Sequence, residues 1–146
     1  MYEGGIRVPF IVRWPGKIKA GVDNNYIGAF WDVFPTFTQI AKTASPSYLD
    51  GISILPTLRS SKQTQHEYLY WEFHEGGGKQ AVRSGNWKAV RLNVFDKSKT
   101  AVELYNLSKD PSETNNIAAL YPEIVKRLTS LMDEAHTPSD IFPFGE

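Results

Sequence analysis

Four short runs of strand-forming residues dominate the second half of the chain and constrain its fold more than any other feature. They cover residues 68–73, 80–84, 87–92 and 102–107, and turn-forming segments separate them. Ser84-Gly85-Asn86 is a connection short enough for a tight hairpin. The pattern predicts a four-stranded antiparallel meander, whose apolar face needs a further element to cover it.

An amphipathic segment follows the last run and supplies that element. Between Pro122 and Ala135 the apolar residues recur at helical spacing and form one stripe: Ile124, Val125, Leu128, Leu131, Met132 and Ala135. Pro122 suits the first position of a helix, and Pro138 follows shortly after its end. The sequence therefore predicts an α+β unit in which a long helix packs on the sheet.

The segment from Pro9 to Arg13 fits this unit poorly. It is β-branched and apolar, with Gly4-Gly5 before it and Pro15-Gly16 after it, as expected for a short buried strand between turns. A buried strand needs neighbours, and no nearby run supplies a partner. We therefore expect this strand to be the last piece of a sheet whose other strands lie outside the chain.

Two helical segments and a linker complete the first half. Residues 33–41 carry apolar side chains at helical spacing, and Asp32 precedes them as the expected N-cap. Residues 49–59 predict a turn that leads into one short helical segment, and residues 60–67 form a polar linker. The chain is thus expected to divide into residues 1–60 and residues 61–146.

Charge and cysteine content exclude several function classes. Sixteen basic and sixteen acidic side chains give a formal net charge of zero, so nucleic acid and anionic membrane surfaces are not expected partners. No apolar run approaches the roughly 20 residues of a membrane-spanning helix. The absence of cysteine excludes thiol catalysis, cysteine-based zinc sites and disulfides.

Few residues outside the expected core carry an obvious chemistry. His74-Glu75 stands at a strand end before a glycine-rich loop, either as a solvated terminus or as a ligand contact. Arg83, Lys88 and Arg91 surround Trp87 on expected strands. They form either a grip for a sulfated or carboxylated sugar or an exposed sheet face.

Two further patterns are weaker. Gly76-Gly77-Gly78-Lys79 lacks the spacing of a phosphate-binding loop and predicts a flexible hairpin loop instead. No serine stands in a nucleophile elbow, and the three histidines have no helical pairing suited to zinc. The residues alone thus indicate an α+β module without a complete active site.

An ordered series of motifs resembles the type I sulfatases, the arylsulfatase family. The series runs through Tyr2-Glu3-Gly4-Gly5-Ile6-Arg7-Val8-Pro9-Phe10, Trp14-Pro15-Gly16, Asp32-Val33-Phe34-Pro35-Thr36, Asp50-Gly51-Ile52-Ser53-Ile54-Leu55-Pro56, Trp71-Glu72-Phe73-His74-Glu75, Gln80-Ala81-Val82-Arg83, Gly85-Asn86-Trp87-Lys88, Glu103-Leu104-Tyr105-Asn106-Leu107 and Asp110-Pro111-Ser112-Glu113-Thr114-Asn115-Asn116. The first motif resembles the segment that follows the family's active-site lysine. The likeness covers essentially the whole chain.

The resemblance implies a fold in two parts. Residues 1–60 would be the terminal segment of an alkaline-phosphatase-like α/β core. Residues 61–146 would be the smaller C-terminal subdomain, a four-stranded antiparallel sheet packed with a long helix. The orphan strand at Pro9 to Arg13 would then belong to the sheet of the core.

The chain departs from the family at the catalytic residues. Family members hydrolyse sulfate esters with a formylglycine made from a Cys or Ser that is followed by Pro two positions on and Arg four positions on. This sequence has no Cys, and Ser53 has Pro56 and Arg59 at the wrong spacing. The resemblance therefore implies calcium and formylglycine for the full-length enzyme only, and we expect the isolated chain to be inactive.

The sequence-based hypothesis is that the chain completes a sulfatase core and walls its substrate cleft. His74, Glu75 and Arg83 are the candidate substrate-rim contacts, with Arg7 as a structural support near the pocket. The expected partners are the remainder of the core and a sulfated substrate such as a glycan, with self-association of the isolated fragment. The family analogy implies a periplasmic or secreted protein.

The alternative is a non-catalytic carbohydrate-binding or purely structural α+β module. A carbohydrate-binding sheet would expose Tyr70, Trp71 and Trp87 on one face.

Overall fold

The computed structural model describes residues 1–144, which form two compact units. The sheet unit comprises Met1–Val8 together with the chain from Glu67 onward, and the helical unit comprises Pro9–His66. The chain therefore begins in the sheet unit, leaves it for 58 residues and returns. The division expected between residues 1–60 and 61–146 stays a prediction. In the structure the first eight residues pack within the sheet unit, and the helical unit ends at His66.

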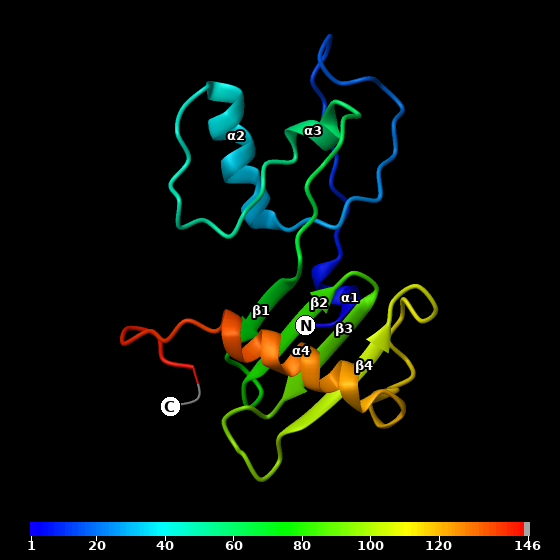
Figure 1. The fold of residues 1–146 in the computed structure, drawn as a ribbon, viewed down its shortest axis with the longest axis vertical. Helices are drawn as coiled ribbons and strands as arrows, with labels where there is room; N and C mark the ends of the chain where they lie inside the picture. The colour runs from blue at the N-terminus through cyan, green and yellow to red at the C-terminus, as the bar shows by residue number, and fades with distance from the viewer. Residues whose placement is uncertain (145–146) are drawn as a thin grey trace. The chain divides into compact units, whose positions relative to one another are not determined.

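The sheet has the predicted meander topology (Figure 1). Its strands are β1 (Leu69–Phe73), β2 (Lys79–Ser84), β3 (Trp87–Leu92) and β4 (Ala101–Asn106), in the order β1-β2-β3-β4 with every pair antiparallel. Ser84 pairs with Trp87, which leaves Gly85 and Asn86 as a two-residue hairpin connection. Gly85 has φ +58°, a conformation that such turns require and that glycine adopts without strain.

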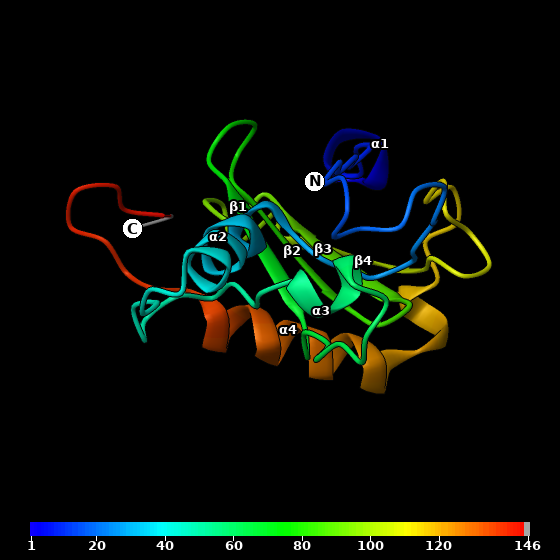
Figure 2. The same ribbon diagram turned by 90° about the horizontal axis from the view of Figure 1, so that it is seen from above.

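Helix α4 (Pro122–Ala135) covers one face of the sheet, and its bounds are those that the sequence predicts (Figure 2). Leu128 and Met132 are one helical turn apart and fully buried, and they pack against Val82, Ala89 and Leu104 from the sheet. A short 3₁₀ helix, η2 (Ala118–Leu120), precedes α4. The predicted α+β packing is confirmed.

The opposite face of the sheet is also covered. It presents Ala81, Val90 and Tyr105, which alternate along the strands with the residues beneath α4. Met1 packs against this cluster, and the short helix α1 (Glu3–Ile6) follows directly (Figure 2). The start of the chain thus forms a second layer on the sheet.

The helical unit contains η1 (Phe30–Asp32), α2 (Val33–Ala41) and α3 (Leu55–Leu58). Residues 7–14 have no regular secondary structure, so the strand expected over Pro9 to Arg13 is not formed in this chain. A strand requires a hydrogen-bonded neighbour, and the described residues offer none to this segment. No helix within residues 1–144 is long and apolar enough to cross a membrane.

Candidate functional site

A buried ion-pair network in the sheet unit joins three distant parts of the sequence. Lys88 on β3 lies with its Nζ 3.1 Å from Glu3 Oε1 and 2.8 Å from Glu113 Oε1. The Lys88 side chain is 0% exposed, and those of Glu3 and Glu113 are 7% and 2% exposed. Arg83 on β2 adds a second cation 3.3 Å from Glu3 Oε2. We call these four residues the Glu3 network.

The strand register explains why the two cations meet. Arg83 and Lys88 stand directly opposite each other on β2 and β3, on the face that Met1 and α1 cover. Like charges at paired positions repel, so an anion between them is needed to hold the buried Lys88 beside the partly exposed Arg83. The carboxylate of Glu3 supplies that anion, and Glu113 balances the remaining charge.

The loop after β4 is built to hold Glu113 in place. Asp110 accepts hydrogen bonds from the backbone N–H groups of Thr114 and Asn115, and these bonds lower the pKa of its carboxyl. Asn116 Oδ1 accepts the N–H of Leu104, which attaches the loop to the edge strand. Glu113 itself has φ +54°, a left-handed conformation that a non-glycine residue rarely adopts.

Glu113 also binds the backbone of the N-terminal part of the sheet unit, Met1–Val8, which we call the first segment. Its Oε2 accepts the N–H of Glu3 at 2.5 Å, so both a side chain and a main-chain group of Glu3 are held. Beside this contact, Tyr2 and Tyr105 both donate their phenolic O–H groups to Glu103 Oε2, at 2.5 and 3.0 Å. Burial and these bonds raise the pKa of Tyr2 to about 12 and also raise that of Tyr105.

The Glu3 network holds the first segment on the sheet and contains no reactive group. Two carboxylates are matched by two cations, and each carboxylate forms an ion pair with at least one of the cations. No group of three or more His, Asp or Glu side chains suited to a metal occurs within residues 1–144, and the sequence has no cysteine. The residues present therefore fit neither a calcium site nor a formylglycine.

The predicted rim residues are not brought together. Arg83 pairs with Leu69 at the start of β1, whereas His74 follows the other end of that strand. Five residues separate Leu69 from His74, so Arg83 and His74 lie about 17 Å apart along the sheet at about 3.3 Å per residue. Arg83 bonds Glu3 and the carbonyl of Gly85. Glu75 is exposed in the loop between β1 and β2. Arg7 is exposed, and its backbone N–H closes α1 on Glu3.

One alternative for the basic residues is an exposed sheet face, and this prediction is wrong for Lys88 and for Arg91. Lys88 is fully buried in the Glu3 network. Arg91 bonds Gln80 Oε1 at 2.8 Å and Asp133 at 2.7 Å, which attaches α4 to the sheet. Nearby, His136 Nδ1 lies 2.6 Å from Glu72 Oε1, a second contact between the end of α4 and the sheet.

The aromatic side chains do not form a sugar-stacking face. Tyr70 and Trp87 pack in the cluster beneath α4, whereas Trp71 packs on the opposite face of the sheet. Because the three rings lie on two covered faces, the carbohydrate-binding alternative finds no support here.

In the helical unit a buried aspartate connects separate segments. Asp32 is 1% exposed and accepts the N–H groups of Ala29 and Ile52, at 2.9 and 2.8 Å. Its Oδ1 also lies 2.8 Å from His66 Nε2. Asp32 is the N-cap residue of α2 as the sequence predicts, but its carboxylate makes no hydrogen bond to that helix. Burial and the charge of Asp32 raise the pKa of neighbouring Tyr26 to about 12.

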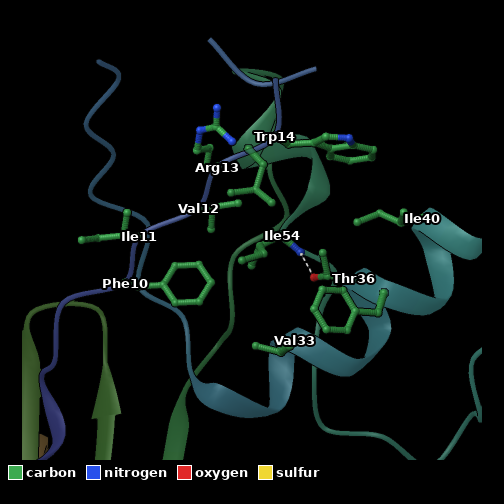
Figure 3. Close-up of a pocket in the computed structure, with 11 residues that line it drawn as sticks. Phe10, Ile11, Val12, Arg13, Trp14, Val33, Thr36, Ile40 and Ile54 are labelled. Carbon is green, nitrogen blue, oxygen red and sulfur yellow. Dashed lines mark hydrogen bonds between the residues drawn. The ribbon is translucent and has the colours of Figure 1, made fainter. Parts of the chain in front are cut away.

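The helical unit also has an open apolar groove of about 420 Å³ (Figure 3). Figure 3 shows that the residues lining it come from segment 10–14, from α2 and from the chain around Ile54. The groove is lined by Phe10, Ile11, Val12, Arg13, Trp14, Val33, Thr36, Phe37, Ile40, Ile54 and Leu58.

Sequence reasoning missed the Glu3 network, although its signals were present. Lys88 stands two positions before the apolar Val90 in a strand, so both side chains lie on the same face. A lysine at such a position needs a buried anion. Glu3 and Glu113 each belong to a motif quoted above, but no local pattern connects residues 85 or 110 positions apart.

Comparison with known proteins identifies the fold family. The family described as N-sulphoglucosamine sulphohydrolase, C-terminal, matches residues 1–137. An N-acetylgalactosamine-6-O-sulfatase from Bacteroides thetaiotaomicron is 31% identical over 93% of this chain and 28% of its own length. Human arylsulfatase K is 30% identical over 88% of this chain and 25% of its own length.

Solved structures agree with the sequence relatives. The structure of BT4656 in complex with its substrate D-glucosamine-2-N,6-O-disulfate has a TM-score of 0.71 and 27% identity, over 85% of this chain and 27% of that one. BT1596, a 2-O GAG sulfatase, has a TM-score of 0.61 and 32% identity, over 70% of this chain and 23% of that one. This chain thus spans about a quarter of the length of the relatives it matches.

The fold is that of the C-terminal sulfatase subdomain, preceded by the last segment of an alkaline-phosphatase-like core. The ordered motifs, the sheet with its helix and the match over residues 1–137 lead to one assignment: this chain belongs to the N-sulphoglucosamine sulphohydrolase C-terminal family and forms the C-terminal portion of a sulfatase.

Proposed function

We propose that this chain completes the core of a sulfate ester hydrolase and walls its substrate cleft, while the catalytic groups come from the upstream part of the enzyme. Formylglycine and calcium are assigned to that upstream part, because the sequence has no Cys or suitably spaced Ser and residues 1–144 hold no side-chain group suited to a metal. The isolated chain is then inactive. The substrate class is a sulfated glycan, by analogy with the relatives named above.

The apolar surface of the helical unit is the observation that carries this proposal. Ile11 is 91% exposed, and Phe10 and Phe37 are 62% and 64% exposed, although all three line the 420 Å³ groove. Phe30, just before α2, and Phe34, in its first turn, add two more exposed rings. Contiguous apolar surface of this kind marks an interface.

The upstream sulfatase core is the occupant that fits this surface. Relatives of this chain are about four times its length, so most of their fold lies outside the matched region. The groove is lined almost wholly by apolar side chains, as a packed core requires. The unpaired segment from Pro9 to Arg13 would add a strand to the sheet of that core.

In this arrangement the chain contributes contacts at the rim of the cleft. His74 would donate or accept a hydrogen bond to the sugar or the sulfate, and Arg83 would attract the sulfate by charge. Glu75 is the third rim residue, and its exposure leaves its carboxylate available. Arg7 would support the pocket, since it follows the segment that Glu3 anchors.

The coding sequence upstream of Met1 gives the most direct test. An in-frame stretch that encodes a Cys or Ser with Pro two positions on and Arg four positions on supports the proposal. A stop codon immediately before Met1 contradicts it. The complete reading frame, produced with formylglycine formation, should release sulfate from a chromogenic sulfate ester and lose this activity when calcium is chelated.

The 146-residue chain is the matched control. It should show no turnover of the same ester with or without calcium. Turnover that persists through rigorous purification would overturn the assignment of the catalytic groups to the upstream part.

A further inference from the structure

His74 lies in an aromatic cluster at one end of the sheet unit. Its ring centroid is 4.0 Å from that of Phe142, 4.9 Å from that of Phe144 and 6.2 Å from that of Phe95. Phe95 and Phe144 also contact each other edge to face, at 5.1 Å and 70°. We call these four residues the His74 cluster.

The floor of the cluster is fixed by backbone contacts. The N–H groups of Val94 and Phe95 donate to the carbonyls of Gly78 and Gly77, at 3.1 and 3.0 Å. Gly78 has φ +76°, and a Cβ on it would lie 2.5 Å from the Phe95 ring. Only glycine therefore permits this approach, and Phe95 is held against the loop that follows His74.

The segment that covers the cluster is not fixed by backbone hydrogen bonds as the floor is. It is Ser139–Phe144, downstream of α4, and within residues 1–144 it has no backbone–backbone hydrogen bond to the rest of the chain. Phe142 contacts the His74 ring at a 45° tilt but is 64% exposed, whereas Phe144 is 7% exposed. The cover is thus attached through ring contacts, and it can lift without breaking a backbone hydrogen bond.

Covering His74 leaves a polar atom without a partner. Its Nε2 is shielded from solvent and has no hydrogen bond from any described residue. A buried ring nitrogen of histidine is normally bonded, so the closed state sacrifices a hydrogen bond that water or a ligand would restore. The ring contacts favour the closed position of segment 139–144, whereas the unpaired Nε2 of His74 favours its opening. The free-energy difference between the two states is therefore small.

We infer that Ser139–Phe144 is a strap that closes over His74, and that the strap must lift before Nε2 can bond a ligand. The strap makes His74 a gated group rather than a permanently open one. Its existence is independent of the proposed enzyme function, and only the identity of the ligand rests on that function.

Carbethoxylation by diethyl pyrocarbonate, located by mass spectrometry, tests the strap on the 146-residue chain. Phe142→Ala should raise the modification rate of His74 about tenfold, the equivalent of one lost aromatic pair contact. Ile141→Ala is the matched control, because Ile141 is 95% exposed in the same segment and should leave the rate unchanged. His66, in the helical unit, serves as an internal reference.

Two results would overturn the strap. One is a His74 in the wild-type chain that reacts as fast as a free histidine. The other is a Phe142→Ala rate equal to the wild-type rate while circular dichroism shows an unchanged fold. Phe142→Leu, which keeps an apolar side chain but loses the ring, should give an intermediate rate and guards against a folding defect.

A ligand measurement separates the strap from the rim role of His74. D-glucosamine-2-N,6-O-disulfate, added to Phe142→Ala, should shift the His74 ring signals in NMR spectra at lower concentration than in the wild-type chain. Equal concentrations in both chains would show that the strap does not gate the ligand. A probe that shifts His74 in neither chain rejects the rim role, while the modification rates decide on the strap separately.

Discussion

Lys88 and Glu113 form an ion pair of 2.8 Å whose side chains are 0% and 2% exposed. The pair connects the middle of the sheet with a loop that begins only after the last strand. Glu3 joins it from the start of the chain, so the network holds three largely buried charged side chains inside the sheet unit. Removal of a single member therefore leaves an uncompensated buried charge.

Lys88→Met should destabilise the sheet unit by about 3–5 kcal/mol, because it leaves the carboxylates of Glu3 and Glu113 buried together. The free energy of unfolding in urea measures this effect. Lys99→Met is the control, since Lys99 is 72% exposed and its ion pair is with Asp96, whose side chain is 44% exposed. Its effect should stay below about 0.5 kcal/mol. A loss no larger in Lys88→Met than in Lys99→Met would contradict the account of the network.

Asp32→Ala should destabilise the helical unit by about 3 kcal/mol, because two backbone N–H groups and His66 lose a charged acceptor. Hydrogen exchange of the Ala29 and Ile52 amides should accelerate in the variant and reports on this unit directly. Asp50→Ala provides the comparison, since Asp50 is exposed. Slow exchange of both amides in Asp32→Ala would mean that the carboxylate is not their acceptor in solution.

Alkaline pH should weaken the attachment of the first segment to the sheet unit. The pKa of Tyr2 is about 12 in the folded chain, above the ordinary value of 10, because burial and the bond to Glu103 favour the protonated phenol. A raised pKa means that the stabilisation is complete below pH 10 and is lost as the pH rises towards 12. Absorbance at 295 nm, which reports tyrosinate, measures this titration.

Glu103→Gln separates the causes of this shift. It should lower the pKa of Tyr2 towards 10 while burial keeps part of the shift. Tyr26, whose pKa is also about 12 but whose charged neighbour is Asp32, should titrate as before. A Tyr2 pKa that does not move in this variant would assign the shift to burial alone.

The isolated chain should self-associate through the exposed apolar surface of the helical unit. Sedimentation velocity should detect species above the monomer mass of 16.5 kDa. Ile11→Lys places a charge in the groove and should shift the chain towards the monomer. Tyr48→Ser, which removes an 83% exposed ring away from the groove, should leave association unchanged. A wild-type chain that sediments as a strict monomer would count against the proposed interface.

The elements that depend on local pattern could be predicted from the sequence. The four strands and the hairpin at Gly85 follow from short apolar runs between turn residues, and α4 follows from its apolar stripe and Pro122. In each of these elements the residues that set the conformation are neighbours in the sequence. Their bounds agree with the structure to within one or two residues.

The elements that depend on distant partners could not be predicted in the same way. Asp32 has the sequence features of a helix cap, but its carboxylate binds the N–H of Ile52 and the ring of His66 instead. Pro9 to Arg13 has the composition of a strand, but pairing requires a neighbour that these residues do not have. Lys88 is polar, yet its burial depends on Glu3 and Glu113, which no periodicity relates to it.

The separation of Glu3 from its partners also sets an order of events during synthesis. Glu3 lies 85 residues before Lys88 and 110 residues before Glu113. At ribosomal rates of about 5–20 residues per second, the 110 residues to Glu113 take about 6–22 s, and its carboxylate waits that long before both partners have been made. The docking of the first segment is thus among the last steps of folding, and a nascent chain halted before Glu113 would carry that segment undocked.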